Sequence, residues 1–121
     1  MRIIFLFLLL TGFIFSAEAQ QNSKQIYNIQ TDGLEQIKAA VNEAAAENKH
    51  VLIQVGGNWC PWCIKFYNFC QAVPAIDSLI KENYIMVHLN YSKENKNLPA
   101  LQQLEYPQRF GFPVLVILDN K

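Results

Sequence analysis

The chain has 121 residues, of which 51% are hydrophobic and 17% are charged, and its ten basic and ten acidic residues give zero net charge at pH 7. This balance predicts one globular domain with a buried core and excludes an intrinsically disordered chain. The basic residues form no patch along the sequence, which argues against a nucleic acid as partner and against a polybasic membrane contact.

Residues 1–19 have the pattern of a secretory signal peptide. Arg2 precedes an apolar run from Ile3 to Phe15, and Ala17-Glu18-Ala19 matches the small-x-small cleavage pattern. The run is shorter than the stretch of about 20 apolar residues that spans a bilayer, so a cleaved signal is favoured over an uncleaved anchor. We therefore expect an exported protein, periplasmic or secreted, with no stable membrane anchor after cleavage and in a compartment where disulfides persist.

A polar N-terminal segment, residues 20–32, is expected to follow the signal. Alternating apolar side chains within it predict a short strand over residues 25–30. Asp32 or Gly33 then caps a helix whose apolar residues lie on one face. This helix opens the expected main domain, which spans residues 33–121.

Predicted strands and helices alternate through the rest of the chain. Residues 51–55 are apolar on both faces of a strand, as a central strand covered by helices on both sides must be, and Gln54 is the exception. The other expected elements are helices over residues 64–73, 75–82 and 98–104 and strands over residues 84–89 and 114–118.

Two cysteines, Cys60 and Cys63, stand where the strand over residues 51–55 leads into a helix. Residues i and i+3 at a helix start lie on one face about 5–6 Å apart at Cβ, so the pair can close a disulfide without moving the backbone. Pro61 suits the first helical turn, where its missing N–H costs nothing. A helix N-terminus lowers the pKa of a thiol, so Cys60, which we expect to be exposed, is the predicted nucleophile. Cys63 is the predicted resolving thiol, which attacks the mixed disulfide.

Two other interpretations of the cysteine pair stay open. One is a structural disulfide, although a bond that closes so short a loop removes little entropy from the unfolded chain. The other is a metal site, which would need about four ligands when only Cys70, His50 and His88 remain as candidates. Haem attachment would require a histidine where Ile64 stands. We expect no metal and no cofactor, and we expect Cys70 to be a buried packing residue.

The order of these elements around Trp59-Cys60-Pro61-Trp62-Cys63, with an aromatic residue and Pro113 opening the last strand, resembles the thioredoxin superfamily. The resemblance is closer to its exported bacterial members and runs from about Gly33 to Lys121. It implies an α/β fold of thioredoxin type, in which helices flank a central mixed sheet. It also implies a monomeric thiol–disulfide oxidoreductase that acts on protein thiols and disulfides together with a redox donor or acceptor protein.

The resemblance also assigns roles around the cysteines. Pro113 aligns with the cis-proline of the family, whose loop lies against the cysteine pair and whose preceding backbone pairs with the substrate. Trp59, Trp62, Phe112 and Pro113 are therefore expected to bind substrate. Gln54 stands six residues before the first cysteine, where thioredoxins carry a buried Asp that assists proton transfer to the resolving thiol. It is the proton-relay candidate, although an amide does not titrate and can only hydrogen-bond.

Two further departures from the family pattern concern redox direction and chain length. The dipeptide Pro61-Trp62 is neither the Gly-Pro of cytosolic thioredoxins nor the Pro-His of strongly oxidising relatives, so reduction, oxidation and isomerisation stay open. The final antiparallel edge strand and C-terminal helix of the family do not follow Leu118. We expect a C-terminally truncated domain that lacks about 25–40 residues.

Two functions of another kind stay open beside the enzyme. One is a non-catalytic thioredoxin-like binding or assembly module whose cysteine pair is a redox-sensitive disulfide, and a buried Cys60 would favour it. The other is a carrier of a metal or a thiol group, which stoichiometric copper or zinc in the purified protein would favour.

Overall fold

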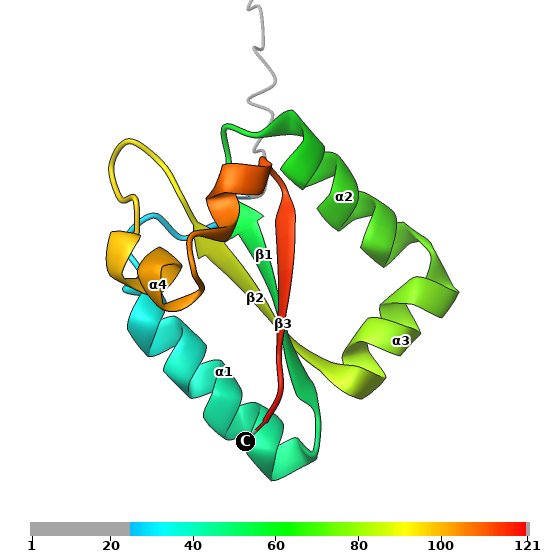
Figure 1. Ribbon diagram of the computed structural model, residues 1–121. Helices are drawn as coiled ribbons and strands as arrows, with labels where there is room; N and C mark the ends of the chain where they lie inside the picture. The colour runs from blue at the N-terminus through cyan, green and yellow to red at the C-terminus, as the bar shows by residue number, and fades with distance from the viewer. Residues whose placement is uncertain (1–24, 121) are drawn as a thin grey trace, which may run out of the picture.

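The computed structural model describes residues 25–120, so the expected signal peptide, residues 1–19, lies outside the described residues. The chain folds into a three-stranded mixed sheet flanked by helices (Figure 1). β1 (His50–Gly56) is the central strand, with β2 (Tyr84–Asn90) parallel to it on one side and β3 (Val114–Leu118) antiparallel to it on the other. The expected α/β fold of thioredoxin type is confirmed.

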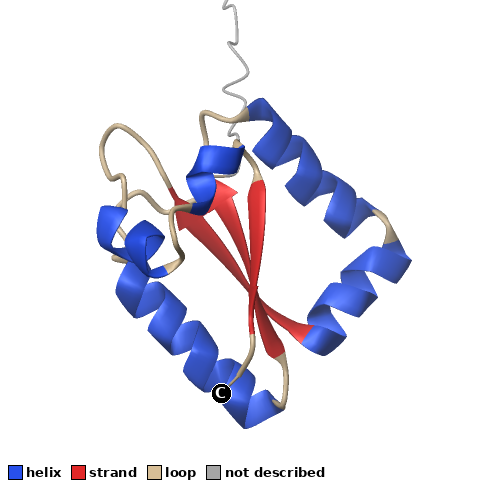
Figure 2. Ribbon diagram, in the orientation of Figure 1, coloured by secondary structure: helices blue, strands red, loops and turns tan. Residues whose placement is uncertain are grey.

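Helices cover both faces of this sheet (Figure 2). α1 (Gly33–Glu47) and α4 (Leu98–Gln103) lie on one face. α2 (Pro61–Ala72) and α3 (Pro74–Asn83) lie on the other, and Val73 ends α2 where Pro74 begins α3. No helix among residues 25–120 has both the length and the apolar character needed to cross a membrane.

The ends of α1 follow the capping chemistry of its sequence. The Asp32 side chain accepts hydrogen bonds from the backbone N–H groups of Leu34 and Glu35, which confirms Asp32 as the N-cap. Asn48 ends the helix in the left-handed conformation, with a φ of 54°. A Cβ on Gly33 would lie 2.6 Å from Leu89, so glycine lets the helix start approach β2 closely.

The central strand is buried on both faces, as its composition predicts. Gln54 is the polar side chain among its buried residues, which are Val51, Leu52, Ile53, Gln54, Val55 and Gly56. On the α1 face Val51, Ile53 and Val55 join the main core, which also contains Ile37, Ala40, Val87, Leu89 and Leu101. On the α2 face, Gln54 has His88 of β2 and Leu115 of β3 as its register neighbours. The polar residue of the strand therefore lies under the helix that carries the cysteines.

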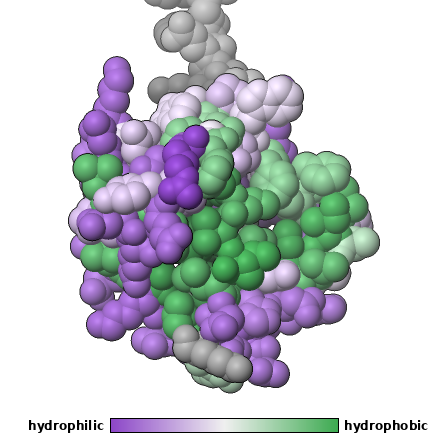
Figure 3. All heavy atoms as spheres, viewed as in Figure 1, coloured by the Kyte–Doolittle hydropathy of each residue, from purple (hydrophilic) through white to green (hydrophobic). Residues whose placement is uncertain are grey.

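The side chains of β3 alternate between two surroundings along the strand. Val114, Val116 and Leu118 pack against the main core, whereas Leu115 and Ile117 are 44% and 58% exposed. Figure 3 shows hydrophobic side chains gathered around β3 and toward α2 and α3. The α2–α3 face of the sheet thus has exposed apolar surface at its β3 edge.

The prediction of a strand over residues 25–30 is wrong, because these residues form an irregular segment with a turn. The backbone N–H groups of Ile26 and Tyr27 bond to the side chain of Asn58, and the Asn58 amide donates to the Tyr27 carbonyl. An asparagine side chain therefore takes the place that a neighbouring strand would occupy in a ladder.

Candidate functional site

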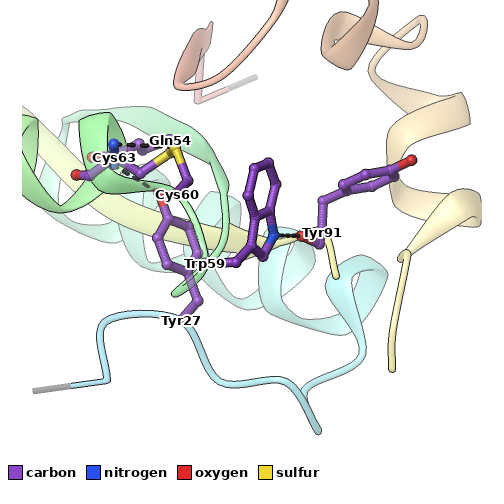
Figure 4. Close-up of a disulfide and its surroundings, with 6 residues drawn as sticks. All are labelled: Tyr27, Gln54, Trp59, Cys60, Cys63 and Tyr91. Atoms are coloured by element: carbon purple, nitrogen blue, oxygen red, sulfur yellow. Dashed lines mark hydrogen bonds between the residues drawn. A yellow bond between two sulfur atoms is a disulfide. The ribbon is translucent and has the colours of Figure 1, made fainter. Parts of the chain in front are cut away.

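The cysteine pair lies at the junction of β1 and α2. Cys60 is the N-cap of α2, and its Sγ accepts a hydrogen bond from the backbone N–H of Cys63 at 3.2 Å. Pro61 occupies the first helical turn, as expected. Cys60 and Cys63 form a disulfide with a Cα–Cα distance of 5.3 Å (Figure 4). The sulfur of Cys60 therefore faces an N–H donor at the positive end of the helix dipole.

Both cysteines are covered, which corrects one expectation. Cys60 is only 3% exposed and Cys63 is fully buried, so the prediction of an exposed Cys60 is wrong for the disulfide form. Tyr27 belongs to the same buried cluster, and Ile26 and Phe112 pack against it. What distinguishes Cys60 from Cys63 is its position as the helix cap, not its exposure.

Aromatic side chains surround the loop before Pro113. The Phe112–Pro113 peptide bond is cis, as the resemblance implied. Phe112 packs against the cysteine cluster, stacks on Tyr91 with ring centroids 5.2 Å apart, and meets the Trp59 ring edge-on at 5.3 Å. The Trp59 indole N–H donates to the Tyr91 carbonyl at 2.6 Å, which fixes a ring that is 53% exposed.

Trp62 lies on the α2 side of the same loop and is 66% exposed. The Lys65 ammonium lies 4.6 Å from the centroid of its ring, in a cation–π contact. A groove of about 420 Å³ is lined by Trp62, Lys65, Phe66, Phe69, Phe112 and Pro113. The structure thus brings three of the four expected substrate residues into one groove, while Trp59 lines a second groove with Tyr91, Ser92, Lys93, Glu94 and Lys96.

Gln54 is fully buried beneath the disulfide. Its amide Nε2 donates one hydrogen bond to the Tyr27 hydroxyl at 2.7 Å and another to the Cys63 carbonyl at 3.1 Å. The amide of the proton-relay candidate thus contacts the backbone of the resolving cysteine. Its Oε1 atom has no hydrogen-bond partner within the described part of the chain.

Tyr27 and Asn58 are site residues that sequence reasoning missed. Tyr27 is fully buried, and its hydroxyl points toward the disulfide (Figure 4). Burial raises the pKa of Tyr27 to about 12, although the hydrogen bond from Gln54 acts in the opposite direction. The one available signal was compositional, since Tyr27 is the only aromatic residue between the expected signal peptide and the first helix. Asn58 gave no such signal, because its partners lie more than 30 positions away.

Gly56 allows this side chain and a cysteine sulfur to approach one another. A Cβ at Gly56 would overlap the Cys63 Sγ atom and would lie 2.8 Å from the Tyr27 hydroxyl oxygen. The sulfur and the hydroxyl therefore both border the same small space, which only a glycine leaves open.

His88 completes the polar group beneath the disulfide. It is the register neighbour of Gln54, and its ring contacts those of Tyr27 and Tyr67 at centroid distances of 5.7 Å and 5.2 Å. Burial lowers the pKa of His88 to about 4, so its imidazole is neutral at neutral pH. Its Nε2 atom is buried without a hydrogen-bond partner among residues 25–120.

The third cysteine lies apart from this group. Cys70 is a free, buried thiol on α2, which confirms the expectation that it is a packing residue. Burial raises its pKa. Across the described residues, no three His, Cys, Asp or Glu side chains gather as the ligands of a metal ion would.

Comparison with known proteins gives one family and one solved structure. A family model described as Thioredoxin-like matches residues 31–120. The crystal structure of a disulphide isomerase from Xylella fastidiosa Temecula1 superposes with a TM-score of 0.70 at 23% sequence identity, over 78% of this chain and 72% of that one. No curated protein matches the sequence.

Proposed function

The chain belongs to the thioredoxin-like family, and from this premise we propose that it is a thiol–disulfide oxidoreductase acting on protein thiols and disulfides. The observation that carries the proposal is the position of Cys60 as N-cap of α2, with its sulfur accepting the Cys63 N–H. The same N–H donor and the helix dipole stabilise a thiolate there once the disulfide is reduced. The fold shared with a disulphide isomerase is consistent with this chemistry.

In the reductive direction Cys60 and Cys63 act in sequence. The Cys60 thiolate attacks one sulfur of a partner disulfide, and the other partner sulfur leaves as a thiolate and takes a proton from solvent. Cys63 then loses its proton to solvent and attacks the Cys60 Sγ atom, so that the Cys60–Cys63 bond forms, the bond to the partner breaks and the partner sulfur leaves as a thiolate. Two electrons pass from the protein to the partner. The oxidative direction is the reverse of the same steps.

The partner is expected to approach over the aromatic rim of the disulfide. The groove lined by Trp62, Phe112 and Pro113 is mostly apolar, so it suits an extended segment with an apolar side chain near its cysteine. Trp59 borders the other side of Phe112 and can contact the same segment. Trp59 and Trp62 are already exposed, so the surface needs little rearrangement.

The proposed setting is an exported one. The signal-like pattern of residues 1–19 supports delivery to the periplasm or the exterior, where protein disulfides form and persist. A dedicated redox donor or acceptor protein would then restore the cysteine pair after each turnover.

Trapping of mixed disulfides tests the proposal. In a Cys70→Ala background, Cys63→Ser leaves an attacking thiol without its resolving partner and is expected to accumulate disulfide-linked partners. Cys60→Ser, the matched control, is expected to accumulate few of them. Equal trapping by both variants would overturn the roles of the two cysteines, and no trapping by either would overturn the function.

A non-catalytic binding module with a redox-sensitive disulfide is the second candidate, and the burial of Cys60 favours it. The two functions differ in turnover. An oxidoreductase supplied with reductant reduces many equivalents of a peptide disulfide, whereas the module can exchange only the one equivalent that its own cysteine pair carries. Turnover beyond one equivalent, lost in Cys60→Ser, would exclude the module.

A further inference from the structure

The orientation of the Gln54 amide decides where the proton of the Tyr27 hydroxyl points. The nitrogen of that amide must face the Cys63 carbonyl, since the opposite orientation would set two carbonyl oxygens against each other at 3.1 Å. The same nitrogen therefore donates to the Tyr27 oxygen at 2.7 Å. Because the hydroxyl accepts from Gln54, its own proton is directed to another acceptor.

The acceptor that the packing offers is the sulfur of Cys63. Tyr27 shares its buried cluster with Cys60 and Cys63, and its hydroxyl and the Cys63 sulfur both border the space left by Gly56. We propose that Tyr27 is a catalytic residue whose hydroxyl donates a hydrogen bond to the Cys63 sulfur when the disulfide opens, with Gln54 as the residue that positions it. The proposal rests on the proposed function, because it concerns the thiol that resolves the mixed disulfide.

The electrostatics of this site make the Cys63 thiolate depend on a hydrogen-bond donor such as the Tyr27 hydroxyl. Among the titratable groups of the described chain, Cys60 shares the buried cluster of Tyr27 and Cys63, His88 contacts the Tyr27 ring, and Tyr67 contacts His88. The lowered pKa keeps His88 uncharged at neutral pH, and the raised pKa keeps Tyr27 protonated. Neither group acts as a base there, but a protonated hydroxyl remains a hydrogen-bond donor over the whole neutral range. A thiolate in a buried site without cations is costly unless it accepts a hydrogen bond.

The consequence for the reaction concerns the second step. The hydrogen bond stabilises the Cys63 thiolate, which attacks the Cys60 sulfur of the mixed disulfide and releases the partner as a thiolate. The Cys63 proton leaves to solvent, and the Tyr27 proton stays on its oxygen. Tyr27 thus increases the fraction of Cys63 that is ready to attack without itself changing charge.

The first test reads the Cys63 thiolate directly, without any partner. In a Cys60→Ser, Cys70→Ala background, Cys63 is the only thiol, and its pKa follows from thiolate ultraviolet absorbance against pH. Loss of a hydrogen bond to a charged group should make Tyr27→Phe raise the Cys63 pKa by about one to two. Tyr84→Phe is the matched control, since Tyr84 begins β2 at the end of the sheet opposite to the disulfide. An unchanged Cys63 pKa in Tyr27→Phe would overturn the proposal.

The second test follows the chemical step. In Tyr27→Phe, single-turnover release of glutathione from its mixed disulfide with Cys60 should slow by about three- to tenfold at neutral pH. The rate falls because less Cys63 is thiolate, and it falls by less than the thiolate fraction does because a more basic thiolate is a stronger nucleophile. The inflection of the pH–rate profile should move to higher pH together with the Cys63 pKa. A rate that falls equally at every pH would mean that Tyr27 only supports the fold, and the proposal would be wrong.

A fluorinated tyrosine at position 27 covers the case in which Tyr27→Phe does not fold. It keeps the shape of the side chain but is a stronger hydrogen-bond donor, so it should lower the Cys63 pKa, and a rise or no change would contradict the proposal. The absorbance measurement also separates the two hypotheses. If the Cys63 pKa moves as expected while Cys63→Ser traps no partner, the hydrogen bond from Tyr27 to Cys63 stands and the proposed function fails.

Discussion

Asn58→Ala would remove three hydrogen bonds at once and release the segment that carries Tyr27. The Asn58 Oδ1 atom accepts from the N–H groups of Ile26 and Tyr27 at 3.0 Å each, and Nδ2 donates to the Tyr27 carbonyl at 2.8 Å. Alanine offers neither the acceptor nor the donor. We expect residues 25–30 to detach more easily and the disulfide to become accessible beneath them.

The expected loss of unfolding free energy follows from the number of hydrogen bonds removed and from the segment that they fix. Each partly buried hydrogen bond contributes about 0.5–1.5 kcal/mol, so the three together contribute roughly 2–4 kcal/mol. With a urea m-value of about 1–3 kcal/mol/M for a small domain, the unfolding midpoint should fall by roughly 1–2 M. Tyr27, which is fully buried in the docked segment, would lose protection before the sheet unfolds.

Urea unfolding and amide hydrogen exchange measure the two effects. The amides of Ile26 and Tyr27 should exchange much faster in Asn58→Ala, while those of β1 follow the change in global stability. Asn68→Ala is the matched control, because Asn68 is exposed on α2. The reasoning would be refuted if Asn58→Ala kept the wild-type midpoint and the protection of both amides.

Two further predictions concern groups beneath the disulfide. The pKa of His88 is lowered from 6.5 to about 4, so as the pH falls His88 takes up a proton in the unfolded chain before it does so in the folded one. The free energy of unfolding should therefore decrease as the pH drops from about 6.5 toward 4, by up to about 3 kcal/mol. His88→Gln should remove this part of the acid dependence of the urea midpoint, and an unchanged acid limb would show that His88 is not its source. Gly56→Ala forces a Cβ against the Cys63 sulfur and the Tyr27 hydroxyl, so thermal unfolding should show a loss of about 1–3 kcal/mol. A variant as stable as the wild type would mean that this space is larger than the structure has it.

Local patterns were sufficient for much of the fold. The apolar stripe and the Asp32 cap predicted α1, and the apolar run at residues 51–55 predicted the central strand, because these signals involve residues close together in sequence. The Cys60–Cys63 pair is also local, since a helix start brings positions i and i+3 onto one face whatever the rest of the chain does.

The errors arose where distant segments meet. The segment at residues 25–30 has strand-like alternation, but its backbone bonds to Asn58, which is more than 30 residues away. Cys60 was expected to be exposed because a helix cap usually reaches solvent, yet Ile26 and Phe112 come from two other parts of the chain to cover the cysteine cluster.

The sequence by itself determined which residues can do the chemistry, a cysteine pair at a helix start behind a buried strand, because propensity, capping and spacing act over a few residues. Only the tertiary structure decided the surroundings of that pair. The pairing of β1 with β2 sets Gln54 beside His88, and the docking of residues 25–30 sets the Tyr27 hydroxyl against Gln54 and Cys63. Such neighbours depend on strand register and packing between segments far apart in the chain, and no local pattern of residues records either.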